Sequence, residues 1–145
     1  MRVAIASDHA GFEQKQQLVD YLASELKVDA IDCGPDTDDR VDYPDYAKKV
    51  ADMVVSGEAD RGVLVCGTGI GMALAADKVA GIRASSITSP EFADLFRRHN
   101  DGNVVCLSGR FVDLQVNKDI IKVFLTAEFE GGRHAERVAK VMKLD

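Results

Sequence analysis

Short apolar runs alternate along the chain with longer stretches in which apolar residues recur every three or four positions. The short, β-branched runs predict strands at Arg2–Ser7, Val28–Cys33, Gly62–Cys66, Ile82–Ile87 and Asn103–Ser108. The longer, helically periodic stretches predict helices at Phe12–Leu26, Pro44–Ser56, Gly69–Val79, Pro90–His99, Leu114–Ala127 and Arg133–Met142. Such alternation is typical of a parallel sheet covered by helices on both faces. We therefore predict an α/β fold, a three-layer α-β-α sandwich with a five-stranded parallel sheet and a C-terminal helix.

The composition narrows the class of protein. With 145 residues, of which 46% are hydrophobic, the chain can form one buried core, and we expect a single domain over residues 1–145. The net charge is −6 and no long basic run is present, so we expect no nucleic acid partner. The first residues are too polar for a signal peptide or a membrane span, so we expect a cytoplasmic protein without membrane contact.

The three cysteines are an odd number and form no C-x-x-C pair, so neither a disulfide framework nor a zinc site is indicated. Cys33 and Cys106 lie on strands that we expect to be central, where a cysteine serves as a small buried apolar residue. Cys66 stands at the end of a predicted strand and is the remaining candidate for a working thiol.

Polar and reactive side chains follow three of the predicted strands. Asp8 and His9 follow the first strand, Cys66-Gly-Thr-Gly-Ile-Gly71 closes the third strand, and Arg110 follows the fifth. Parallel strands bring their carboxyl ends to one edge of the sheet, which is where open α/β sheets bind ligands. We therefore expect these side chains to share one site.

The glycine-rich turn after the third strand has two interpretations. Gly67, Gly69 and Gly71 let the backbone turn tightly and present amide groups to an anion or an oxyanion at the start of a helix. Such surroundings favour the thiolate form of Cys66. The turn by itself is equally compatible with a tight connection around a buried, inactive thiol.

The spacing of the turn excludes three related motifs. A dinucleotide fingerprint starting at Gly67 requires glycine at position 72, which is occupied by Met72. A phosphate-binding P-loop requires a lysine followed by serine or threonine, and neither follows Gly71. A cysteine phosphatase loop requires arginine where Met72 stands. Nucleotide binding and phosphoryl transfer are therefore not expected.

Further candidates lie away from this turn. His99 and Asn100 precede the fifth strand, so they lie at the opposite edge of the sheet from Cys66. Either they contribute to the active site of a neighbouring subunit, or they cap their own helix, with Asn100 in the left-handed conformation. Arg133 and Arg137 share one helix face and are either a phosphate clamp or a solvated surface pair. Tyr43 precedes a helix and either contacts a substrate hydroxyl or fixes the entry to the helix.

Six segments, in this order along almost the whole chain, resemble the type B ribose-5-phosphate isomerase family: SDHAGF from Ser7, DYPDYA from Asp42, CGTGIG from Cys66, GIRA from Gly81, RHND from Arg98 and EGGRHAERV from Glu130. The same family contains galactose-6-phosphate and allose-6-phosphate isomerases. The resemblance implies a Rossmann-like homodimer or dimer of dimers in which two subunits build each active site. It also implies catalysis without a cofactor.

The resemblance implies a role for each candidate. Cys66 is the base that moves a proton between C1 and C2, and His99 assists opening of the sugar ring. Thr68 and the amides of Gly67, Gly69, Ile70 and Gly71 would hold the enediolate. Asp8 and Asn100 would bind sugar oxygens, and His9, Arg133 and Arg137 would hold the phosphate with Arg110 close by. We add Tyr43 to the expected substrate-binding residues because of its position before a helix.

The expected reaction is the interconversion of ribose 5-phosphate and ribulose 5-phosphate in the pentose phosphate pathway, through an enediolate. Alternatives within the class are galactose 6-phosphate, allose 6-phosphate or a tetrose phosphate. An alternative outside it is a non-catalytic phosphosugar-binding module, which would be marked by loss of Cys66, Thr68 or His99, and none is lost. Relatives that lack the cysteine carry a glutamate where this chain has Met72, which indicates the cysteine-dependent branch.

Overall fold

Five strands form one sheet: β1 (Arg2–Ser7), β2 (Asp29–Asp32), β3 (Arg61–Cys66), β4 (Ala84–Ser86) and β5 (Val104–Ser108). They pair in parallel in the order β2-β1-β3-β5-β4, so the direction in which strands are added to the sheet reverses between β1 and β3. The structure, a computed structural model, describes all residues from 1 to 145. Its helices are α1 (Phe12–Ser24), α2 (Tyr43–Ser56), α3 (Ile70–Ala76), α4 (Pro90–Asn100), α5 (Leu114–Thr126) and α6 (Arg133–Met142).

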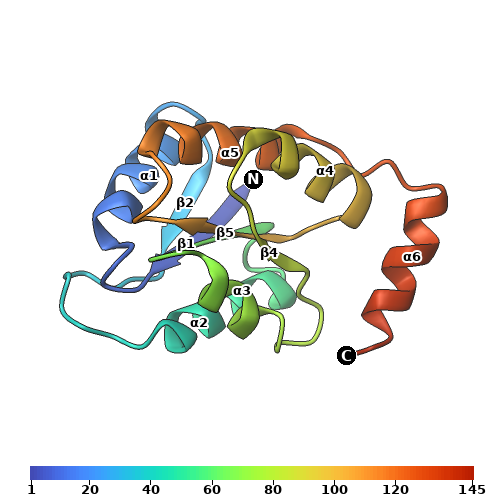
Figure 1. The fold of residues 1–145 in the computed structure, drawn as a ribbon, viewed down its shortest axis with the longest axis horizontal. Helices are drawn as coiled ribbons and strands as arrows, with labels where there is room; N and C mark the ends of the chain where they lie inside the picture. Colours follow the sequence, from blue (N-terminus) through green and yellow to red (C-terminus); the bar gives the residue numbers. More distant parts are fainter.

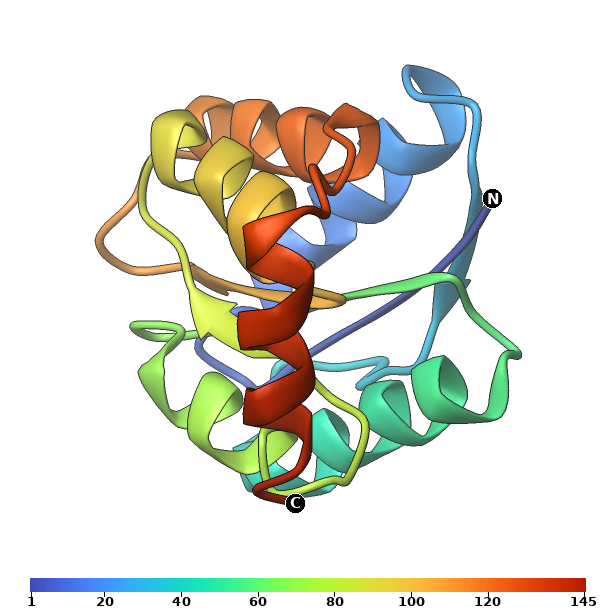
Figure 2. The same ribbon diagram turned by 90° about the vertical axis from the view of Figure 1, so that its right-hand side faces the viewer.

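Helices cover both faces of the sheet, with α1, α4 and α5 on one side and α2 and α3 on the other (Figures 1 and 2). Successive side chains of a strand point to opposite faces. In β1, Val3 and Ile5 join the core under α1, α4 and α5, while Ala4 and Ala6 join the core above α2 and α3. This explains the continuous apolar runs in the sequence and confirms the predicted three-layer fold.

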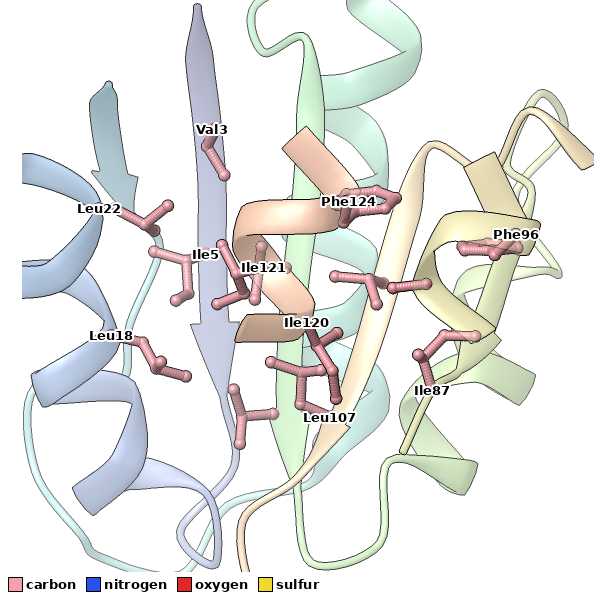
Figure 3. Packing of buried hydrophobic residues seen from close by; sticks show 14 residues of the cluster. Val3, Ile5, Leu18, Leu22, Ile87, Phe96, Leu107, Ile120, Ile121 and Phe124 are labelled. Carbon is pink, nitrogen blue, oxygen red and sulfur yellow. The ribbon is translucent and has the colours of Figure 1, made fainter. Parts of the chain in front are cut away.

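The larger core lies between the sheet and the layer of α1, α4 and α5 (Figure 3). Leu18 and Leu22 of α1 are fully buried, as are Ile120 and Phe124 of α5. The ring of Phe124 stacks on that of Phe96 from α4, with 6.1 Å between their centroids. Residues four apart lie on one face of a helix, so each pair lies on the buried face of its own helix.

The structure corrects one prediction about the cysteines. β2 is an edge strand, and Cys33 lies just beyond it and is only half-buried, so the expectation of a central, buried Cys33 is wrong. Cys106 lies on the interior strand β5 and is fully buried. Its burial raises the pKa of the Cys106 thiol well above its ordinary value, and the neighbouring Cys66 raises it further.

The C-terminal helix α6 has the predicted bounds and lies at the edge of the molecule (Figures 1 and 2). None of its residues is buried; it lies beside α4, and the Sδ atom of Met142 accepts a hydrogen bond from Nη1 of Arg83 at 3.6 Å. None of the six helices combines the length and the apolar character that a membrane span requires.

A buried lysine connects α1 to the loop that follows β2. The side chain of Lys15 is fully buried, and its Nζ donates to the two carboxylate oxygens of Asp32, at 3.0 and 3.1 Å. The same Nζ donates to the backbone oxygen of Pro35 at 2.7 Å. These bonds compensate the ammonium group for lost hydration and fix the start of the loop over residues 33–42.

Replacing this lysine by methionine should cost about 2 to 3 kcal/mol of unfolding free energy. Lys15→Met keeps the apolar stem but removes the only donor to the Pro35 oxygen and the charged partner of Asp32, which then accepts only the Gly34 amide. Partial exposure of Asp32 keeps the cost below that of a fully buried pair. The matched control is Lys48→Met, which removes an exposed ion pair with Asp52 and should change stability by less than about 0.5 kcal/mol. Urea unfolding at one fixed protein concentration measures both, and equal effects would contradict the assignment.

Candidate active site

The strand order reverses between β1 and β3, whose carboxyl ends lie side by side. Open α/β sheets bind ligands at such a reversal, and the residues around it are here called the crevice. Asp8 is the first residue after β1. Its amide donates to the backbone oxygen of Val65 at 3.1 Å, and its Oδ1 accepts the amide of Gly11 at 3.0 Å. Asp8 is nearly buried, and the hydrogen bond to Gly11 holds its carboxylate in one orientation.

His9 is oriented by the loop that follows β2. Its Nδ1 lies 3.2 Å from the backbone oxygen and 3.3 Å from the backbone nitrogen of Val41. The Nε2 atom of the ring makes no hydrogen bond within the chain, so it is available to a ligand. The loop that Lys15 anchors at its start therefore reaches the crevice near its end and fixes the imidazole.

The turn over Cys66–Gly71, here called the Cys66 turn, brings a thiol and several free amides together. Cys66 is 5% exposed, and its Sγ accepts the amide of Gly69 at 3.1 Å. Gly69 has φ +83°, and a Cβ atom there would lie 3.1 Å from the backbone oxygen of Cys106. Only glycine adopts this positive φ without strain and has no Cβ atom to meet the Cys106 oxygen, so Gly69 fixes the shape of the turn.

Three amides of the Cys66 turn have no partner within the chain. The amides of Gly67, Thr68 and Gly71 donate no hydrogen bond, whereas that of Ile70 donates to the Thr68 hydroxyl at 3.2 Å. Unpaired amides beside a thiol are suited to an oxygen that carries negative charge. Of the two interpretations left open by the sequence, this geometry favours a working thiol.

The connection after β5 is pinned against the Cys66 turn. The hydroxyl of Ser108 donates to the backbone oxygen of Gly67 at 2.8 Å, and the amide of Arg110 donates to the same oxygen at 3.2 Å. A Cβ atom at Gly67 would lie 3.4 Å from Nη1 of Arg110, which places the guanidinium beside the turn. Ser108 was not among the predicted site residues, because a serine that ends a strand has no distinctive sequence pattern.

The phenol of Tyr43 also lies on the Cys66 turn. A Cβ atom at Gly71 would lie 2.7 Å from Cε1 of Tyr43 and 2.8 Å from its Cζ, so the ring packs directly on this glycine. Tyr43 is the first residue of α2 and is 38% exposed. The crevice thus holds a carboxylate, an imidazole, a thiol, a guanidinium and a phenol from four separate segments.

The other predicted site residues lie at the opposite edge of the sheet. Helix α4 runs from the carboxyl edge back to the start of β5, so His99 and Asn100 at its end lie far from the Cys66 turn along the strand direction. Arg133 and Arg137 lie on α6, beside the end of α4. The structure therefore divides the candidates into two groups, as the position of His99 before the fifth strand predicted.

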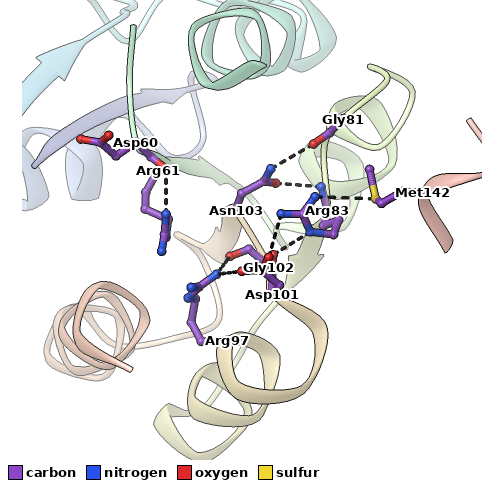
Figure 4. Close-up of polar contacts among 9 residues, drawn as sticks. All are labelled: Asp60, Arg61, Gly81, Arg83, Arg97, Asp101, Gly102, Asn103 and Met142. Carbon is purple, nitrogen blue, oxygen red and sulfur yellow. Dashed lines mark hydrogen bonds and ion pairs between the residues drawn. The ribbon is translucent and has the colours of Figure 1, made fainter. Parts of the chain in front are cut away.

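The end of α4 is fixed by a network of arginines (Figure 4). Asp101, not Asn100, has the left-handed conformation, with φ 49°, so the prediction of Asn100 as the cap is wrong. The Asp101 carboxylate accepts from Arg97 at 2.9 Å and its backbone oxygen accepts from Arg83 at 2.7 Å. Asp101 can adopt this conformation because two guanidinium groups hold it, and Asn100 remains free for other contacts.

His99 belongs to a group of polar side chains between α4 and α6. Its Nε2 lies 3.3 Å from Oε1 of Glu130, and its ring stacks on that of His134 with centroids 4.2 Å apart. Loss of solvent lowers the pKa of His134, and the neighbouring His99 and Arg133 lower it further. Glu130 and His134 were not predicted, because their proximity to His99 depends on how α6 packs.

A cavity of about 790 Å³ opens beside this group, between α6 and the edge formed by β4 and α4. Its polar lining includes His99, Asn100, His134 and Arg137, and its apolar lining includes Val138, Val141 and Met142 of α6. The cavity contacts the second group of candidates and none of the crevice residues.

This chain is similar to known proteins over almost its whole length. Residues 3–141 match the ribose/galactose isomerase family. Ribose-5-phosphate isomerase B of Escherichia coli is 44% identical over 144 residues, which are 99% of this chain and 96% of that protein.

Solved structures agree with the sequence comparison. The structure of Clostridium thermocellum ribose-5-phosphate isomerase B has a TM-score of 0.97 at 45% identity, covering 99% of this chain and 97% of the other. That of Mycoplasma genitalium ribose-5-phosphate isomerase B with bound ribulose 5-phosphate has a TM-score of 0.93 at 42% identity, covering 99% and 95%.

Proposed function

The chain belongs to the ribose/galactose isomerase family, and on this premise we propose that it interconverts ribose 5-phosphate and ribulose 5-phosphate. The observation that carries the chemistry is the Cys66 turn, where a thiol adjoins unpaired amides at the topological switch point. The substrate rests on the named relatives and on the ribulose 5-phosphate bound to the Mycoplasma genitalium protein. We place this reaction in the pentose phosphate pathway and the single-domain enzyme in the cytoplasm.

In the proposed mechanism the Cys66 thiolate removes the C2 proton of the open-chain aldose, and the electron pair forms the enediolate. The amide of Gly69, which already donates to Sγ, stabilises the thiolate. The free amides of Gly67 and Gly71, together with Thr68, hold the developing oxyanion. A proton moves from O2 to O1 of the enediolate, the thiol returns its proton to C1, and C2 and O2 form the carbonyl group of the ketose. All protons and electrons in these steps come from the protein and the substrate.

Substrate contacts in this proposal come from both groups of residues. From the crevice, Asp8 and Tyr43 bind sugar oxygens, and His9 and Arg110 approach the phosphate. From a second copy of the chain, His99 assists ring opening, while Asn100, Arg133 and Arg137 complete the sugar and phosphate contacts. Planar guanidinium groups suit a phosphate because each offers paired donors.

The separation of the two groups supports a shared site. The Cys66 turn ends β3 at the carboxyl edge, whereas His99 ends α4 at the amino edge of the same sheet. One chain cannot bring both to a single sugar, so we propose a homodimer, or a dimer of dimers, in which each site combines the crevice of one chain with α4 and α6 of its partner.

Removing the thiol should abolish most proton transfer. Cys66→Ala should lower kcat/KM for ribose 5-phosphate by at least about 100-fold, the usual contribution of a general base. The matched control is Cys106→Ala, because burial keeps this second thiol protonated and unreactive. Exchange of the C2 proton with solvent deuterium measures the chemical step directly. Nearly full activity in Cys66→Ala would rule out the assigned base.

The substrate assignment is tested by comparing phosphorylated aldoses. The wild-type protein should show its highest kcat/KM with ribose 5-phosphate, against galactose 6-phosphate, allose 6-phosphate and erythrose 4-phosphate. A preference for a hexose phosphate would replace the proposed substrate and keep the isomerase class. Binding of ribose 5-phosphate without C2 proton exchange would instead indicate a non-catalytic binding protein.

The shared site predicts complementation between two inactive variants. Equal amounts of Cys66→Ala and His99→Ala chains, mixed and allowed to exchange subunits, should recover activity in heterodimers, because one of the two sites in each heterodimer contains both wild-type residues. Random association gives a ceiling of about a quarter of wild-type activity. Subunit exchange is verified by mass spectrometry of intact dimers. Exchange without any recovery would show that the two residues do not act in one site across the interface.

A further inference from the structure

Two histidines and one glutamate converge at the end of α4. The ligating atoms of His99, Glu130 and His134, here called the histidine cluster, all lie within 4.8 Å of one another. His99 comes from the last turn of α4, Glu130 from the connection after α5, and His134 from the first turn of α6. The proposed mechanism uses His99 alone and leaves the other two without a role.

Backbone contacts hold the histidine cluster together. The amide of Glu130 donates to the backbone oxygen of Arg98 at 3.0 Å, which fixes the connection against the end of α4. The two imidazole planes are inclined by only 10°. Both histidines also line the cavity of about 790 Å³, so an ion from solvent can reach them.

We propose that the histidine cluster binds a divalent transition-metal ion of the Zn²⁺ class, and that the bound ion inhibits the enzyme by occupying His99. Two imidazoles and one carboxylate are a common ligand set for zinc, with the fourth position left to water. Ligands at about 2.0 to 2.1 Å from zinc lie about 3.3 Å apart. Because an imidazole binds a metal in the plane of its ring, the two stacked rings must turn out of their parallel arrangement to share one ion. Mg²⁺ and Ca²⁺ prefer oxygen ligands and should not compete. The inhibitory effect rests on the proposed function, whereas the binding does not.

The surrounding charges define the kind of site. Arg98 donates to Oε1 of Glu130 at 3.1 Å but also to Asp94 at 3.0 Å, so it keeps a partner when the glutamate turns to a metal. Arg133 and Arg137 on α6 carry positive charge and lower the affinity for a cation. Because these arginines offset the charge of Glu130, the histidine cluster should bind the ion reversibly, as regulation requires, and not as a permanent structural metal.

Direct binding of ZnCl₂ tests the site independently of activity. Isothermal titration of the full-length assembled protein should give one ion per chain, both in the wild type and in Cys66→Ala, which lacks the competing thiol. His134→Ala and Glu130→Gln should each weaken binding by at least about 10-fold, since even loss of an outer contact costs 10- to 100-fold. Glu136→Gln, which removes a carboxylate of α6 outside the histidine cluster, should bind as the wild type does. Equal affinity in all variants would overturn the proposal.

Cobalt identifies the ligands. Co²⁺ bound to the wild type should show ligand-field bands in the visible spectrum without sulfur-to-metal charge transfer, and the bands should disappear in His134→Ala. A charge-transfer band that accounts for all the bound metal would assign the ion to a cysteine and overturn the proposed site.

The inhibitory effect is measured with ribose 5-phosphate. Zinc should slow the wild-type enzyme, and His134→Ala, compared with its own zinc-free rate, should need at least about 10-fold more zinc for the same inhibition. Zinc binding at the histidine cluster with no change in rate would overturn the inhibitory role. If the protein isomerised no sugar phosphate at all, the proposed function would fail, while the titration and the cobalt spectrum would still decide the metal site.

Discussion

The parallel direction of the five strands determines where every candidate functional side chain lies. Each strand ends at the same edge, so Asp8, Cys66 and Arg110 meet although they are far apart in the sequence. Each helix must return the chain to the opposite edge before the next strand begins. A residue such as His99, at the end of a returning helix, is therefore placed away from the crevice by the same constraint that builds the crevice.

The backbone segments at the switch point approach one another closely because glycines there carry no side chain. A Cβ atom at Gly11 would lie 2.4 Å from the backbone oxygen of Val65, and one at Gly109 would lie 3.1 Å from Cα of Gly11. These glycines let the loops after β1, β3 and β5 share a space too small for ordinary residues. Close packing of these loops brings backbone amides of the Cys66 turn, three of them unpaired, next to the side chains of the crevice.

The sequence predicted the parts of the structure that depend on local periodicity. Strand and helix positions follow from it, as does the separation of Cys66 from His99, because both depend only on the order of elements along a parallel sheet. The partial exposure of Cys33 was missed, because strand order is set by non-local pairing. The left-handed conformation at Asp101 and the contact of His134 with His99 were missed for a similar reason, since each depends on side chains from other elements. The family resemblance supplied the roles of residues, which neither periodicity nor spacing could give.

The lack of buried side chains in α6 affects the local stability of this helix. A helix of ten residues without a buried side chain gains little from tertiary packing beyond the contacts of His134 and Met142, and isolated helices of that length are marginal in water. In a single chain its amides should therefore open and exchange with solvent at a small free-energy cost, far below that of β1 or β3. If a partner chain covers α6, ordering of this helix and association become one thermodynamic step, and Arg133 and Arg137 are preorganised for an anion only in the assembled state.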